Sequence, residues 1–169
     1  MGRASVKENK NAYQLAREEL GLTREKAASL LEAMSAEQIE KIESEKRLPY
    51  EDEVLLMAKK YKKPSLCNYY CANQCSIGIK YVPEIKSKEL SAIVVEMLAS
   101  LNAADKTKER LIEIARDGVV STNEIDDFIF IQEELERISI TVKTLQLWSE
   151  RMLATGVIDA DQYNARKKK

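Results

Sequence analysis

Apolar residues recur at helical spacing along most of the 169-residue chain and predict an all-α fold. In the first such segment, Ala12, Leu15, Ala16 and Leu20 fall on one face of a helix. Together with similar faces that follow, this predicts four helices before Pro64. They span residues 11–20, the stretch from Thr23 to a corner at Met34–Ser35, the stretch from Ser35 to Arg47, and residues 51–61. A fifth helix beyond Pro64 would complete a five-helix N-terminal domain.

Residues with strong end preferences mark the borders of these helices. Gly21 stands where a left-handed residue ends the first helix, and Thr23 stands at the N-cap of the second. Ser35 and Gln38 have the spacing of a capping box, which predicts that a helix begins directly after Ser35. Pro49 ends that helix.

The C-terminal half is also predicted to be helical. Residues 87–101 have a clear apolar face, and Asp105 is expected to cap a shorter helix after them. Ser121 and Glu124 have capping-box spacing before the longest predicted helix, residues 125–152.

The long helix has apolar residues in heptad steps of three and four. This set consists of Phe128, Ile131, Leu135, Ile138, Val142, Leu145 and Met152. A second apolar face shows that the helix is covered on more than one side. Two interpretations remain open: a dimerisation helix that uses the heptad set as its interface, or the central helix of a monomeric bundle.

Three cysteines lie four residues apart just after Pro64. Ser65 is expected to cap a helix that carries Cys67, Cys71 and Cys75 on one side. Buried structural thiols are the favoured interpretation, ahead of a metal site or a redox switch. Zinc sites usually combine two close pairs of ligands, and no second pair exists here. No metal and no cofactor is therefore expected.

The composition shift after the cysteines predicts the domain organisation. Residues 1–76 form the N-terminal domain, including the cysteine helix. Residues 77–86 contain a proline and are expected to be an extended linker. Residues 87–169 form a helical C-terminal domain for dimerisation or sensing.

Composition limits the function further. A formal net charge of -1 excludes a generally basic nucleic-acid binder, so any DNA contact must be a local patch. The absence of histidine excludes histidine-based catalysis, and no other catalytic constellation is found, so an enzyme is not expected. No apolar run has the length of a membrane span, and three unpaired cysteines without a signal peptide favour the cytoplasm.

Residues 11–63 resemble the Cro/lambda-repressor (XRE-type) helix-turn-helix domain of bacterial and phage-like transcriptional regulators. The resemblance is carried by Arg17–Thr23 (REELGLT), Ser35 with Ile39, Ile42–Glu43, and the ending Lys46, Arg47 and Pro49. It implies double-stranded DNA as the partner. By position, the DNA-binding residues would be Arg24, Ala36, Glu37, Gln38, Lys41, Lys46 and Arg47. The acidic residues Glu37 and Glu40 depart from the family, because carboxylates repel phosphates.

These observations lead to one leading hypothesis and two alternatives. The first is a dimeric, sequence-specific DNA-binding regulator in which Gln38 reads a base, since an amide can contact adenine with two hydrogen bonds. The second is an antitoxin-like or adaptor module that keeps the helix-turn-helix as a scaffold and offers its acidic third helix to a protein partner. The third is a regulator that responds to metal or thiol chemistry at the three cysteines.

Overall fold

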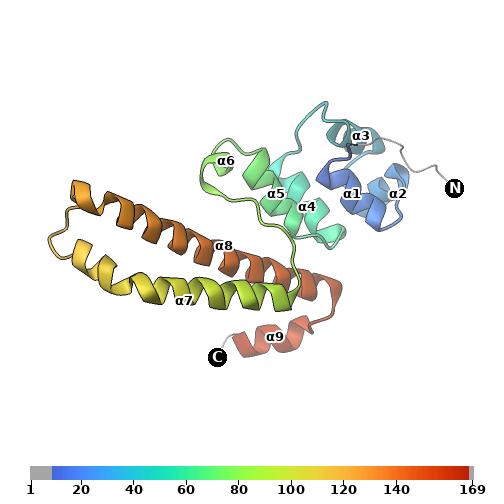
Figure 1. Cartoon of the computed structure of the whole chain (residues 1–169). Coiled ribbons are helices and arrows are strands. Elements are labelled where there is room, and N and C mark those ends of the chain that lie inside the picture. Colours follow the sequence, from blue (N-terminus) through green and yellow to red (C-terminus); the bar gives the residue numbers. More distant parts are fainter. Residues whose placement is uncertain (1–8, 168–169) are drawn as a thin grey trace. The chain divides into compact units, whose positions relative to one another are not determined.

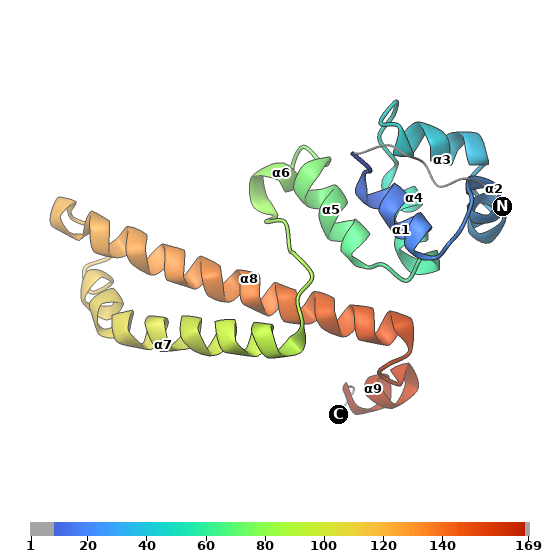
Figure 2. The ribbon, with the colours of Figure 1, turned by 45° about the vertical axis from the view of Figure 1, so that its right-hand side comes forward.

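The structure is a computed structural model and describes residues 9–167 (Figures 1 and 2). Within this range the chain is all-helical, with no β-strand. The helices are α1 (Ala12–Glu19), α2 (Arg24–Leu31), α3 (Ala36–Glu43), α4 (Glu51–Lys60), α5 (Ser65–Asn73), α6 (Gly78–Tyr81), α7 (Leu90–Ile114), α8 (Ile125–Thr155) and α9 (Ala160–Lys167). A short 3₁₀ turn, η1 (Thr122–Glu124), leads into α8.

The chain divides into two compact units, which are described separately. The first unit runs to Glu84 and takes in residues 150 onward, and the second unit is Ile85–Ser149. The sequence-based prediction had instead placed residues 87–169 together.

The first unit is built around one apolar core. In it α2 packs on α3 and α4, α1 on α3 and α5, and α5 on α4 and α6. The most deeply buried side chains include Tyr13, Leu31, Ile39, Ile42 and Met57. Two of these, Ile39 and Ile42, belong to α3, so the core fixes the side of α3 that turns inward.

The predicted caps of α2 and α3 are confirmed. The Thr23 hydroxyl accepts the Lys26 N–H at 3.3 Å. Ser35 and Gln38 form a complete capping box, in which the Gln38 carbonyl oxygen accepts the Ser35 N–H at 2.7 Å. Gly21 has the positive φ (64°) expected after the first helix. These local hydrogen bonds fix where α2 and α3 begin.

Helix α3 is shorter than predicted, because it ends at Glu43 and not near Arg47. Glu45 then takes a positive φ of 61°. The N–H groups of Glu45 and Lys46 turn back to the carbonyls of Ile42 and Lys41. This is the hydrogen-bond pattern of a Schellman ending, with glutamate where glycine is commonest.

Three local predictions in the middle of the chain are wrong. Pro64, not Ser65, occupies the N-cap position of α5. Residues 77–86 are not extended throughout, because Gly78–Tyr81 form α6 against α5. Asp105 does not cap a separate helix, because α7 runs unbroken through it as a single 25-residue helix.

The second unit is a helical hairpin. Helices α7 and α8 run side by side in opposite directions (Figures 1 and 2). The predicted capping box between Ser121 and Glu124 is confirmed at the start of the second arm. The long helix is confirmed too, and α8 extends three residues beyond the predicted end.

Candidate functional site

Helix α3 carries most of the residues predicted to contact DNA. It buries Ile39 and Ile42 against the core, together with Glu43. On its other side Glu37 and Gln38 are exposed, and Lys41 is partly exposed. The capping box holds the first turn of this surface in place.

A buried ion-pair cluster lies behind this surface and joins three helices. Glu43 of α3, whose side chain is 1% exposed, accepts two hydrogen bonds from Arg17 of α1, at 2.5 and 2.9 Å. Its second oxygen also accepts the Arg24 Nε–H at 2.8 Å. Hydrogen bonding to Glu43 raises the pKa of the Arg17 guanidinium against the opposing effect of burial. Arg24, which was predicted to contact DNA, therefore forms an ion pair with Glu43 inside the domain.

The two lysines predicted to contact phosphates are also paired with glutamates. Lys41 bonds Glu37 one turn earlier at 2.8 Å, and Lys46 bonds Glu40 at 3.0 Å. These hydrogen bonds lower the pKa of both carboxyl groups, so Glu37 and Glu40 are ionised at neutral pH. All four groups are exposed or partly exposed to solvent.

Arg47, the fourth predicted cation, contacts Glu53 of α4 with both terminal nitrogens, at 2.6 and 2.8 Å. Glu53 also accepts the Tyr50 N–H at 2.8 Å. Burial opposes ionisation of Glu53, but these hydrogen bonds outweigh it and lower its pKa. The guanidinium lies 5.5 Å from the centre of the Tyr50 ring. Arg47 thus fixes the loop between α3 and α4.

The structure places all the predicted DNA-binding residues in the first unit and pairs every predicted cation with a glutamate. Glu43 and Glu53 were missed as partners. Glu43 follows Ile39 by four residues, so helical phase alone could have shown that it faces the core. Gln38 has a further constraint, because its carbonyl oxygen already accepts the Ser35 N–H. A two-bond contact to adenine must share that oxygen or break the cap.

The three cysteines are half-buried in and after α5. The helix ends at Asn73, so Cys75 lies beyond it, and its sulfur accepts the Gly78 N–H at 3.4 Å. Burial raises the pKa of the Cys67 thiol, which favours its protonated form at neutral pH. Within residues 9–167 no cluster of three or more cysteine or acidic groups has the geometry to hold a metal ion.

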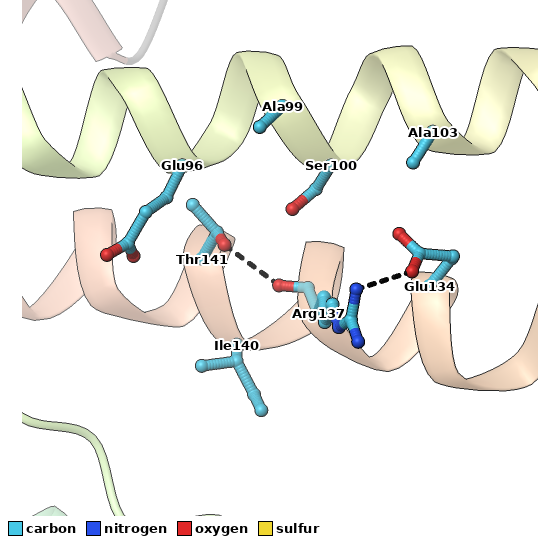
Figure 3. Close-up of a pocket in the computed structure, with 8 residues that line it drawn as sticks. All are labelled: Glu96, Ala99, Ser100, Ala103, Glu134, Arg137, Ile140 and Thr141. Carbon is cyan, nitrogen blue, oxygen red and sulfur yellow. Dashed lines mark hydrogen bonds and ion pairs between the residues drawn. The ribbon is translucent and has the colours of Figure 1, made fainter.

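The second unit contains an open hollow of about 430 Å³ between α7 and α8 (Figure 3). Its lining residues are Glu96, Ala99, Ser100, Ala103, Glu134, Arg137, Ile140 and Thr141. Two hydrogen bonds join lining residues: Arg137 donates to Glu134 at 2.6 Å, and Thr141 donates to the Arg137 carbonyl at 2.8 Å. On α7 the lining is mostly small, with Ala99, Ser100 and Ala103. The hollow therefore has the features of a gap between small side chains.

The hairpin divides the heptad set predicted as a dimer interface. Ile131 is buried at the seam with α7, and Phe128, Ile138, Leu145 and Met152 are partly buried. Only Leu135 and Val142 are exposed, at 48% and 41%. The sequence pattern did not separate the residues that face α7 from those that face outward.

Comparison of the chain with protein-family models, curated proteins and solved structures finds no significant match. Among residues 9–167, no helix combines the length and apolar character needed to span a lipid bilayer.

Proposed function

We propose that the protein is a sequence-specific DNA-binding regulator that acts as a dimer, with residues 11–63 forming a Cro/lambda-repressor-type helix-turn-helix. The observation that carries the proposal is the packing of α2 on α3 with a capping box at the start of α3. This arrangement leaves Glu37, Gln38 and Lys41 on an outer surface. In proteins of this type, the second helix enters the major groove with its N-terminal residues toward the bases.

The paired charges divide the predicted contacts into two groups. Lys41 and Lys46 hold exposed glutamates, and exposed ion pairs contribute little to stability. A DNA phosphate can therefore replace Glu37 or Glu40 as the partner of each lysine at low cost. Arg24 and Arg47 hold buried or bidentate partners, so their main role is to keep α2, α3 and α4 in place.

A second candidate function is a protein-interaction module that retains this domain as a scaffold. It is favoured by the pairing of Arg24, Lys41, Lys46 and Arg47 with glutamates, which leaves α3 without a net positive surface. Glu37 is the most exposed member of these pairs, at 76% of its side chain. A basic partner protein would then bind the acidic face of α3.

Charge reversal on α3 separates the two functions. Glu37→Lys combined with Glu40→Lys removes two phosphate-repelling groups and releases Lys41 and Lys46. For a DNA-binding protein, affinity for duplex DNA should rise by on the order of 10-fold or more at moderate salt. Fluorescence anisotropy with a labelled duplex measures the change.

The matched control is Glu109→Lys with Glu133→Lys, which adds the same charge at exposed positions of α7 and α8. It should raise affinity far less, because the added charges lie outside the α3 surface. An equal rise in both variants would mean that only net charge matters. Unchanged DNA affinity in the α3 variant, together with loss of a co-purifying protein, would favour the interaction module.

A further inference from the structure

The seam of the α7–α8 hairpin combines large apolar residues with small and polar ones. Positions of α7 that face α8 follow alternating steps of four and three: Ile93, Met97, Ser100, Ala104, Thr107, Leu111 and Ile114. Positions of α8 that face α7 include Ile131, Glu134, Ile138, Thr141 and Leu145. Besides the large apolar side chains of the seam, many others lie on the surface of the hairpin.

Helix geometry assigns those outer residues to one of two sides. Successive residues are rotated by about 100° about the helix axis. Because the two helices are antiparallel, the residues that come directly after a seam residue in the sequence point to the same side of the hairpin on both helices. Positions that precede a seam residue share the opposite side. The hollow in Figure 3 agrees, because Glu96, Ala99 and Ala103 of α7 meet Arg137 and Ile140 of α8 there, and each precedes a seam residue.

The side opposite the hollow is strongly apolar as far as Leu101 of α7, beyond which the charged residues Asp105 and Lys108 follow the seam. The large apolar residues on this part of the side are Leu90, Val94, Leu98, Leu101, Leu135 and Val142, which we call the apolar face. Each is between 38% and 57% exposed. They present roughly 500 Å² of apolar surface, near the upper limit of what single-chain proteins expose.

The apolar face also carries no charge. On α7 the positions following the seam from residue 90 to residue 101 are all aliphatic. On α8 the neighbouring positions on this side are Gln132, Ser139 and Gln146. The side with the hollow, by contrast, carries Glu96 and Arg137.

We propose that the apolar face is the surface on which a second copy of this chain packs, so that two hairpins form a four-helix bundle. The proposal rests on the dimer of the proposed function and identifies its interface. A twofold contact places the same patch against itself, which suits a surface without charges because no like charges meet. Two copies together bury about 1,000 Å² from the six aliphatic residues alone, which reaches the minimum size of a specific interface before any surrounding residue is counted. The three- and four-residue steps are those of bundle packing.

This interface differs from the heptad set predicted from the sequence. Ile131, Ile138 and Leu145 belong to the seam inside the hairpin, so they are not available to a second copy. Leu135 and Val142 remain, and α7 supplies the other four residues.

Leu98→Glu tests the proposal, with Val95→Glu as its matched control. Leu98 lies on the apolar face and is 57% exposed, whereas Val95 lies three residues away on the outer side of α7 and is 67% exposed. Sedimentation equilibrium of the full chain, without DNA, should give twice the 19.2 kDa chain mass for the wild type and for Val95→Glu. Leu98→Glu should raise the dimer dissociation constant by on the order of 100-fold and give the single-chain mass.

Far-UV circular dichroism accompanies each mass measurement. If Leu98→Glu also loses helix while Val95→Glu does not, the result still supports the proposal, because a side chain that is exposed in one hairpin becomes essential only when a second copy covers it. A monomeric wild type, a dimeric Leu98→Glu, or equal effects of the two substitutions would overturn it. Loss of DNA binding caused by changes in α3, with the dimer intact, would bear on the proposed function and leave this interface standing.

Discussion

Replacing Glu43 by glutamine is expected to lower the free energy of unfolding of the first unit by about 3 kcal/mol. Glu43 is almost fully buried and holds Arg17, whose side chain is only 7% exposed, through two hydrogen bonds. Glutamine removes the negative charge and leaves the buried Arg17 guanidinium with the Leu22 carbonyl and, at 3.6 Å, the Glu18 carboxylate as its remaining partners. The two units need not unfold together, so hydrogen exchange in increasing urea, measured on peptides from α1 to α4, is the appropriate readout.

Two further variants sharpen this test. Glu40→Gln removes a carboxylate from the exposed side of the same helix and should leave the unfolding midpoint nearly unchanged. Glu43→Leu combined with Arg17→Met should recover much of the loss, because two apolar groups replace the buried pair. A Glu43→Gln chain as stable as Glu40→Gln would show that the three-helix cluster is not a structural element.

Gly78→Ala is expected to destabilise the contact between α5 and α6 by about 3 kcal/mol or to detach α6 altogether. A Cβ atom at residue 78 would lie 2.0 Å from the carbonyl oxygen of Cys71 and 2.7 Å from its carbonyl carbon. Both are backbone atoms of a regular helix, so the clash cannot be relieved by a side-chain rotation. Hydrogen exchange of the α6 amides, compared with those of α5, measures the effect.

Ser76→Ala provides the comparison for Gly78→Ala, because Ser76 is exposed and lies two residues earlier, in the turn between α5 and α6. It should shift the exchange of α6 by less than about 0.5 kcal/mol. Unchanged protection of α6 in the Gly78→Ala chain would mean that the helix does not dock as closely on Cys71 as the structure shows.

The helix borders were predictable where a short-range signal specified them. Thr23, Ser35 with Gln38, and Ser121 with Glu124 each form hydrogen bonds to groups three residues away, so sequence spacing is sufficient. Asp105 was misassigned because a capping residue can also lie inside a continuous helix, where it bonds Lys108. The short helix α6 was not predicted, because it depends on the close contact of Gly78 with the backbone of α5, and no local sequence pattern reports that contact.

The charge pairs of the candidate site depend on distant parts of the chain. Arg17 and Glu43 are 26 residues apart, and only the packing of α1 on α3 brings them together. The loop after α3 brings Arg47 to Glu53 in the same way. The sequence therefore identified the cations near α3 but not the carboxylates that hold them.

The apolar pattern of α8 was also ambiguous by itself. It is apolar on more than one side, and the choice between seam and outer face depends on how α7 packs against it. Ile131 and Leu135 are both heptad positions, yet one is buried and the other is 48% exposed. Ile131 can be assigned to the seam, and Leu135 to the outer surface, only when the position of α7 against α8 is known.

Selection of the wild-type full chain against a pool of random duplexes, followed by a salt titration on the enriched sequence, is the most direct test of DNA binding by the α3 surface. We expect one sequence to be enriched, and the logarithm of the binding constant should fall with the logarithm of salt concentration with a slope of about -3 to -4. That slope corresponds to Lys41 and Lys46 from each of two copies replacing their glutamate partners by phosphates. No retention at low salt, or retention without any enriched sequence, would contradict the account.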